Sequence, residues 1–144
     1  MPTFREAVEA QDLEAVDALL ADDVVFSSPV AHKPYPGKAI TSAILRTVVE
    51  VFEEFEYVRQ LEDGDSSAYV FTAKVDGLEL TGCDFLVHDQ GGRIVDLMVM
   101  VRPLRAAQAL ADAMAERYPG IVELAGTLAA QGYGTTSDRV TPYP

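Results

Sequence analysis

The sequence has no tryptophan, one cysteine and only two histidines among its 144 residues. The single cysteine, Cys83, cannot form a disulfide within the chain, and a lack of cysteine pairs is typical of proteins from reducing compartments. Two histidines far apart, with no clustered acidic motif and no glycine-rich phosphate loop, give no recognisable metal or nucleotide site. We therefore predict a cytoplasmic protein without disulfides, metal ion or cofactor.

Basic residues are also scarce, with 11 Lys and Arg against 23 Asp and Glu, for a formal net charge of -12. A field of this sign repels phosphate backbones and anionic membrane surfaces. The longest apolar run, at residues 94–101, contains Asp96 and is far shorter than the roughly 20 residues of a membrane span. Residues 1–12 show no basic and no apolar segment of a secretion signal. We expect neither nucleic acid nor membrane as a partner.

The chain does contain 49% hydrophobic residues, and at this length such a composition is typical of one globular domain. Apolar residues at helical spacing, bounded by capping and breaking residues, predict several helices. These are expected at residues 4–20 (two short helices), 38–56, 104–118 and, beyond Pro119-Gly120, up to about 131. A short strand at 24–26 is expected to precede a loop that ends at Gly37.

From Tyr57 onward the apolar pattern changes to a period of two, which predicts an antiparallel meander. Its strands are expected at residues 57–62, 68–75, 78–88 and 93–102. Helices followed by a run of strands indicate an α+β domain with the helices on one face of a curved sheet. Residues 1–118 would form this domain. Residues 119–144 would be an extension that packs over its open end or onto a partner subunit, because Ile121, Val122, Leu124 and Leu128 form an apolar stripe.

The dipeptide Asp76-Gly77 predicts a tight hairpin, and this turn fixes the register of the two flanking strands. Counting back from the turn pairs Lys74 with Glu79 and Tyr69 with Asp84. Asp84 then lies on the apolar face of the hairpin, where desolvation should raise its pKa. Tyr69, directly across, is the nearest candidate donor to its carboxyl group.

The sequence resembles the nuclear transport factor 2-like superfamily, in its SnoaL-like and ketosteroid-isomerase-like branch, over roughly residues 2–116. The segments that carry this resemblance are DLEAVDALLADDVVFSSP, YPGKAI and GCDFLVHDQGGRIVDLMVMVRPL. The resemblance implies a cone-shaped fold in which a bent sheet and helices enclose an apolar pocket. It also implies that the outer face of the sheet makes a dimer.

Position by position, the resemblance places Ser28 where ketosteroid isomerases carry the proton-shuttling carboxylate, and Phe4 where they carry an oxyanion-hole tyrosine. Asp84 matches the aspartic acid of that oxyanion hole, a residue type that can stay neutral and donate a hydrogen bond. Residues 97–100, Leu-Met-Val-Met, lack the aspartate of polyketide cyclases. Lys74-Val75-Asp76 only superficially matches the Arg-x-Asp pair of limonene epoxide hydrolases. We interpret Lys74 and Glu79 as an ordinary cross-strand ion pair and Asp76 as a turn residue.

Two interpretations remain. The first is a pocket that binds a small, largely apolar molecule without a complete catalytic set. The alternative is an isomerase, cyclase or dehydratase-type enzyme on a small carbonyl compound, with Asp84 as acid or oxyanion donor, Tyr69 beside it and His32 as a possible replacement base. The expected pocket residues are Phe4, Val8, Phe26, Ser28, Phe52, Phe71, Leu80, Leu86, Leu97, Val99 and Val101.

The last strand predicts a homodimer. Residues 94–101 are apolar on both faces, so that Leu97, Val99 and Val101 can face the pocket while Met98 and Met100 need cover from a second subunit.

Overall fold

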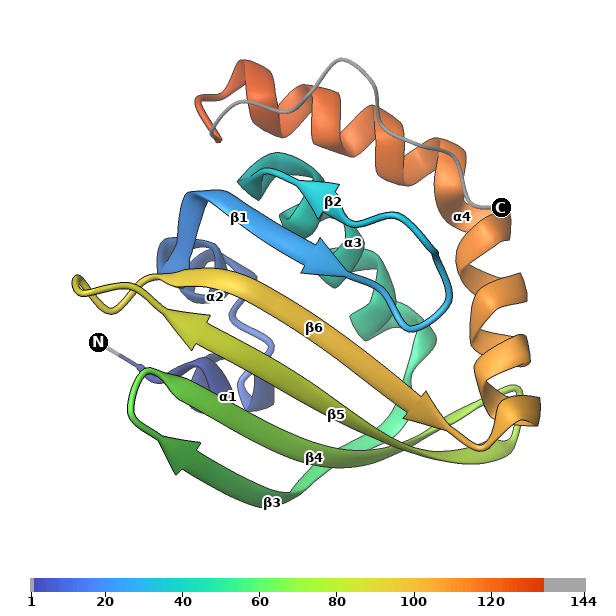
Figure 1. The fold of residues 1–144 in the computed structure, drawn as a ribbon. Coiled ribbons are helices and arrows are strands. Elements are labelled where there is room, and N and C mark those ends of the chain that lie inside the picture. Colours follow the sequence, from blue (N-terminus) through green and yellow to red (C-terminus); the bar gives the residue numbers. More distant parts are fainter. Residues whose placement is uncertain (1, 134–144) are drawn as a thin grey trace.

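The structure is a computed structural model, and it describes residues 2–133 (Figure 1). The tail beyond residue 133, which belongs to the predicted extension, lies outside the described residues. The elements in chain order are α1 (Phe4–Glu9), α2 (Leu13–Leu19), β1 (Leu20–Ser27), β2 (Tyr35–Pro36), α3 (Lys38–Val51), β3 (Glu53–Asp63), β4 (Ser66–Val75), β5 (Leu78–His88), β6 (Ile94–Arg102) and α4 (Leu104–Ala130).

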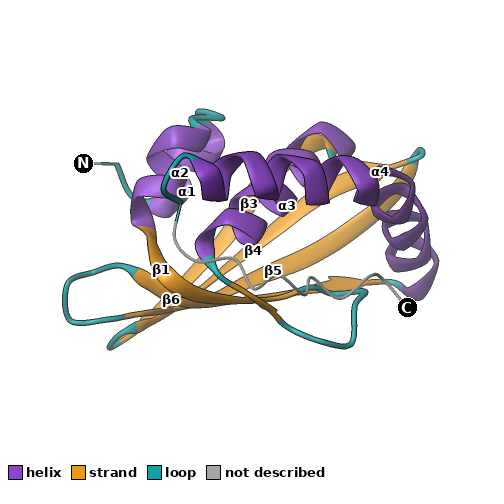
Figure 2. Cartoon of the chain, turned by 90° about the horizontal axis from the view of Figure 1, so that it is seen from above, coloured by secondary structure: helices purple, strands orange, loops and turns teal. Residues whose placement is uncertain are grey.

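The strands form one six-stranded sheet in the order β2-β1-β6-β5-β4-β3. β1 and β6 are parallel, and the other neighbouring strands are antiparallel. The helices of residues 2–133 gather on one face of this curved sheet, and none of them covers the other face (Figure 2). The predicted α+β architecture is confirmed.

The hairpin of β4 and β5 has the predicted register. Asp76 and Gly77 both have positive φ, 50° and 75°, as a type I′ turn requires. Val75 pairs with Leu78, and further along the strands Tyr69 pairs with Asp84. A two-residue turn thus positions a carboxyl group seven residues away on the helix-covered face of the sheet.

The long helix was predicted to reach residue 56, but α3 ends at Val51 and β3 begins at Glu53. The spacing of Phe52 and Phe55 fits a helical period, which explains the wrong boundary. In the structure this spacing comes from an irregularity in the pairing of β3 with β4, where Glu54 adopts a φ of 52°. The bulge lets both phenylalanines reach the interior from an extended segment.

Helix α4 was predicted as two helices separated at Pro119, but it is one helix that contains this proline. It bends between its first and second halves (Figure 1). Proline removes one intrahelical hydrogen bond and crowds the preceding turn, so a bend is the expected result where tertiary packing holds both halves in place.

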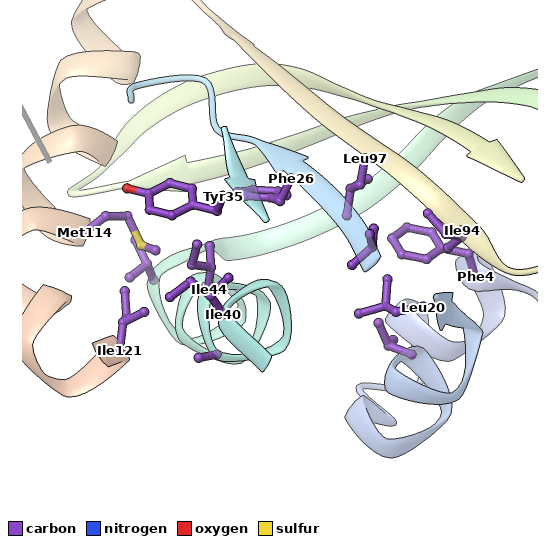
Figure 3. Packing of buried hydrophobic residues seen from close by; sticks show 14 of the residues in the cluster. Phe4, Leu20, Phe26, Tyr35, Ile40, Ile44, Ile94, Leu97, Met114 and Ile121 are labelled. Carbon is purple, nitrogen blue, oxygen red and sulfur yellow. The ribbon is translucent and has the colours of Figure 1, made fainter. Parts of the chain in front are cut away.

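The second half of α4 packs on α3. Ile121, Ala125 and Leu128 are buried, whereas Val122 is 40% exposed. Ile121 and Met114 of α4 lie beside Ile40 and Ile44 of α3 (Figure 3). The buried residues of the described extension therefore pack on the same side of the sheet as the other helices, whereas Val122 of the predicted stripe stays exposed.

A buried polar cluster fastens the helices to one another. The carboxylate of Asp17 on α2 accepts hydrogen bonds from Ser42 Oγ at 2.6 Å and Arg46 Nη2 at 2.5 Å, both on α3. Tyr133 lies just after α4, and burial together with the nearby Asp17 carboxylate raises the pKa of its hydroxyl. Because the buried charge is paired and hydrogen bonded, this cluster joins α2, α3 and the end of α4.

Candidate functional site

A cavity of about 560 Å³ lies between the helices and the covered face of the sheet. It is lined by side chains from α1, α2, α3, β1, β3 to β6 and the first half of α4. The sequence-predicted residues that line it are Phe4, Val8, Phe26, Ser28, Phe52, Phe71, Leu97 and Val99, together with Asp84. The cavity wall is mainly apolar, and Asp84 is the charged side chain that lies deep within it.

Three residues expected in the pocket do not line the cavity. Leu80 and Leu86 lie on the same face of β5 as Asp84, but they are 3% and 1% exposed and belong to the packed core. Val101 is half-buried and packs against this core. Strand parity correctly predicts the face of each residue, but it does not predict where helices pack directly on the sheet and fill the space.

Asp84 is the main electrostatic feature of the cavity. Its side chain is buried, and its Oδ2 accepts a hydrogen bond of 2.8 Å from the hydroxyl of Tyr57. Burial raises the pKa of Asp84 to about 7, while the hydrogen bond from Tyr57 acts in the opposite direction by stabilising the carboxylate. The group is therefore divided between its neutral and ionised forms near neutral pH.

The donor to Asp84 was predicted to be Tyr69, but the structure places Tyr57 in this role. Tyr69 does lie opposite Asp84 in the hairpin, yet its ring stacks on Phe4, with a centroid distance of 6.0 Å, and it is not among the lining residues. Tyr57 is on β3, beyond β4 from Asp84, and reaches across it. Burial and the neighbouring carboxylate raise the pKa of Tyr57, so it remains a donor.

Residues directly opposite in a hairpin have their Cβ atoms close together, but a phenol ring extends well beyond its Cβ atom. The hydroxyl that reaches a buried carboxyl group can therefore come from the next strand. The alternation of Phe55 and Tyr57 in the sequence is the signal that could have identified Tyr57, since it places both rings on the inner face.

The expected replacement base does not reach the cavity. His32 is exposed in the loop after β1 and is not a lining residue, so the structure does not bring it together with Asp84. Ser28 does line the cavity, and its Oγ accepts hydrogen bonds from the backbone N–H groups of Val30 at 3.1 Å and Ala31 at 3.3 Å. Ser28 thus caps the loop and contributes polarity without a basic partner.

Gly82 shapes the cavity wall next to Asp84. A Cβ atom at this position would lie 2.3 Å from the Cζ atom of Phe71, which is the residue opposite it on β4. The absence of a side chain lets the ring of Phe71 lie across β5 and face the cavity. A glycine in the interior of a strand is a recognised signal of such a close approach.

The exposed lining residues define the mouth of the cavity. They are Glu9, Gln11, Glu54 and Glu56, and no Lys, Arg or His occurs among the described lining residues. Glu9 pairs with Arg5 at 3.4 Å, and Glu54 pairs with Lys74 at 2.7 Å. The predicted ion pair of Lys74 with Glu79 is therefore wrong, although their cross-strand register is right, because the bulge in β3 brings Glu54 closer.

Within residues 2–133 the structure shows no group of His, Cys, Asp and Glu side chains suited to hold a metal ion. Over the same range, no helix is both long and apolar enough to cross a membrane.

The family is shown by direct comparison. Residues 3–97 match the model of the SnoaL-like domain, and the chain belongs to this family, whose fold is that of the nuclear transport factor 2-like superfamily. The comparison with curated proteins finds no match.

Solved structures with the same fold include two at substantial identity. A protein described as a steroid delta-isomerase from Pseudomonas aeruginosa is 44% identical, with a TM-score of 0.78, over 83% of this chain and 89% of that one. A protein with a cystatin-like fold from Silicibacter pomeroyi is 38% identical, with a TM-score of 0.76, over 79% of this chain and 81% of that one. A nuclear transport factor 2-like protein from Mesorhizobium loti shares the fold at 19% identity. Its TM-score is 0.62, over 69% of this chain and 85% of that one.

The cavity thus combines an apolar wall with one hydrogen-bonded carboxyl group of raised pKa. Such a group can donate a hydrogen bond when neutral and accept one when ionised. Proton transfer between two positions of a substrate would need a further base or the same carboxyl group acting twice.

Proposed function

We propose that this protein binds a small, largely apolar molecule in the cavity and holds one polar group of it at Asp84. The observation that carries the proposal is a buried carboxyl group in the wall of an otherwise mainly apolar cavity. Binding sites for small molecules combine an apolar wall with few polar groups that fix orientation, and this cavity has that composition.

Among the described residues that line the cavity, the lack of a second catalytic group favours binding over catalysis. Ser28 stands where the resemblance to ketosteroid isomerases places their base, and its Oγ is engaged with the loop backbone. His32, the candidate replacement, is exposed outside the cavity lining. A hydrogen-bond donor alone can hold a carbonyl group but does not remove a proton from the adjacent carbon.

The second candidate is an acid–base enzyme acting on a small carbonyl compound. It is supported by the pKa of about 7 at Asp84 and by the hydrogen bond that Tyr57 donates to this residue. In its neutral form, Asp84 can donate a hydrogen bond to a developing oxyanion. It is also supported by the 44% identity to a protein described as a steroid delta-isomerase.

Two substitutions separate the candidates. Asp84→Asn keeps an amide donor and the side-chain shape, whereas Asp84→Leu removes all hydrogen bonding. Ligand binding, measured with a steroid ketone by calorimetry, should fall mainly in Asp84→Leu. If the unmodified protein only binds its ligand, it should not isomerise an unconjugated steroid enone. The absorbance of the conjugated product measures this reaction.

A conversion rate that depends on Asp84 and disappears in Asp84→Asn would establish the enzyme instead. If neither Nile red nor a steroid ketone bound to the unmodified protein, the proposed function would be wrong, because Nile red reports entry into any apolar cavity of this size.

A further inference from the structure

We propose that the cavity selects its ligand by charge and that its preferred ligand is an apolar amine, held as an ammonium ion at Asp84. The inference rests on the proposed function, since it specifies the chemistry of the molecule that the cavity would bind.

The first observation is the state of the Asp84 carboxyl group. Its Oδ2 is occupied by the hydroxyl of Tyr57, whereas Oδ1 has no hydrogen-bond partner among the described residues. A buried carboxylate with one satisfied oxygen carries a large desolvation cost. A ligand N–H group at Oδ1 would supply the missing hydrogen bond, and a positive charge on that nitrogen would also supply the missing counterion.

The second observation is the distribution of charge around the cavity. Its described lining contains four acidic residues, Glu9, Glu54, Glu56 and Asp84, and no basic one. Two of the acids at the mouth are paired with basic residues outside the lining, and the structure shows no ion pair for Glu56 within the described range. With a net charge of -12 on the chain, the field at the mouth attracts cations and opposes anions.

The third observation is the aromatic wall beside Asp84. The rings of Phe55, Tyr57 and Phe71 are in mutual contact, with centroid distances of 4.9 Å from Phe55 to each of the other two. All three residues line the cavity, as does Phe52, whose ring lies 5.5 Å from that of Phe71. Aromatic faces attract an ammonium group, and they also provide apolar contact for the rest of an amine.

Together these features offset the cost of placing a charged ligand in an apolar cavity. Forming a buried ion pair is unfavourable when polar atoms are left unsatisfied. Here the ammonium ion would complete the hydrogen bonding of Asp84, and its charge would remove the penalty on the carboxylate. A carboxylic acid ligand would instead enter as an anion beside four acids.

The charged and titratable groups that face Asp84 are few. Tyr57 on β3 donates to it, Tyr69 lies opposite on β4, and Arg5 and Glu9 lie beyond these rings on α1. The neighbouring strand β6 places Val99 opposite Asp84, and α4 adds Leu110 and Met114 to the cavity wall. Burial raises the pKa of Asp84 to about 7, so its charge changes within the pH range of the binding test.

Three probes with the same rigid body test the inference: aminoadamantane, adamantanone and adamantane carboxylate. Calorimetric titration at pH 8 should show the strongest binding for the amine, weaker binding for the ketone and none for the carboxylate. The amine stays protonated up to about pH 10, as lysine does, so between pH 8 and pH 6 its affinity should fall roughly tenfold while Asp84 becomes protonated. A ketone that accepts a hydrogen bond from neutral Asp84 should show the opposite slope.

Asp84→Asn should reduce amine affinity at pH 8 at least tenfold. At pH 6, where Asp84 is mainly neutral, the same substitution should leave ketone affinity within about threefold. Glu123→Gln, which removes one negative charge from an exposed position on α4, is the matched control and should leave both affinities unchanged. The pH slope of the unmodified protein remains informative even if Asp84→Asn unfolds.

Equal affinity for amine and ketone, or amine binding that is independent of pH and of Asp84, would overturn the inference while the proposed binding function stands. Preferential binding of the carboxylate would overturn it as well. Failure of all three probes and of Nile red would contradict the proposed function itself.

Discussion

Asp84 is an aspartate whose native environment opposes its ionisation. Its pKa of about 7 lies above that of an aspartate in an unfolded chain, so the folded protein binds more protons than the unfolded chain between about pH 4 and pH 7. The contribution of this group to stability is therefore full below pH 4 and is lost as the pH rises through 7.

The first prediction follows from the raised pKa of Asp84. Asp84→Asn should raise the free energy of unfolding at pH 8 by roughly 1–4 kcal/mol, because each pKa unit corresponds to about 1.4 kcal/mol and the amide has no charge to desolvate. The gain should be much smaller at pH 4. Urea denaturation of both proteins at the two pH values measures it, and a larger gain at pH 4 than at pH 8 would contradict the assignment.

The second prediction concerns the two tyrosines near Asp84. Tyr57→Phe removes a hydrogen bond to the carboxylate and should raise the pKa of Asp84 above 7, since this bond favours the charged form. Tyr69→Phe should have a much smaller effect. The pKa is measured by NMR titration of the carboxyl carbon, and an equal or larger shift in Tyr69→Phe would show that Tyr69 is the donor.

How far the sequence predicts the site depends on the interaction in question. The position of Asp84 follows from a local turn, Asp76-Gly77, and its register, so it could be read from the sequence. The partner of Asp84 depends on the reach of a ring across β4, and the exclusion of His32 depends on the path of a loop. Strand alternation places Tyr57 on the inner face, but it does not show that the ring of Tyr57, rather than that of Tyr69, reaches Asp84. It also does not set the path of the loop that holds His32.

The elements show the same limit at their boundaries. Helix α3 and strand β3 meet at Phe52, where the apolar spacing fits both periods, and the bulge at Glu54 decides between them. Helix α4 continues through Pro119 because Met114 and Ile121, on either side of it, are both held by burial. In both cases tertiary packing overrides a local signal, a competition that a single sequence does not resolve.

The third prediction tests the close contact between β4 and β5. Gly82→Ala forces the ring of Phe71 to move, because the added Cβ atom would lie 2.3 Å from it, and should destabilise the protein by roughly 1–3 kcal/mol. It should also reduce the affinity for cavity ligands, since Phe71 lines the cavity. Thermal and urea denaturation give the first effect, and Nile red titration gives the second.

Gly126→Ala is the matched control for this substitution. Gly126 lies in α4, and an added Cβ would have no heavy atom within 4 Å apart from its chain neighbours and the backbone of its own helix. Because alanine is a better helix former, this change should stabilise the protein by about 0.5–1 kcal/mol. If Gly82→Ala behaved like Gly126→Ala, the close packing of Phe71 on β5 would be incorrect.

At the scale of the whole molecule, the face of the sheet without helices carries an apolar surface. Leu61, Phe85 and Met100 are 52%, 38% and 53% exposed. Leu61, Ala68, Phe85 and Met98 follow one another across β3, β4, β5 and β6 in the strand register, and Met100 lies opposite Cys83 in the adjacent row. A continuous apolar patch on a sheet face is typical of a contact surface.

We expect a second copy of this chain to cover that surface, as the apolar pattern of β6 predicts. A twofold dimer would pair the patch with the same patch of the second subunit, so both copies of each exposed side chain would be buried. The two subunits each carry a net charge of -12, and their repulsion is screened by salt, so the dimer should become more stable as ionic strength rises. Sedimentation at low and at physiological salt measures both the mass and this dependence.

The double variant Phe85→Lys and Met100→Lys should be a monomer, because it places four ammonium groups at the centre of the twofold contact, where they would be desolvated without partners. Both side chains point away from Asp84 by strand parity, so the cavity should keep its affinity for Nile red. Leu104→Lys is the control: Leu104 is 83% exposed at the start of α4, outside the sheet face, and its substitution should leave the mass unchanged.

A monomer of the unmodified protein at micromolar concentration and physiological salt would refute the dimer. A dimer that persists in the double variant would place the contact on another surface, and the exposed row on β5 and β6 would then require a different explanation.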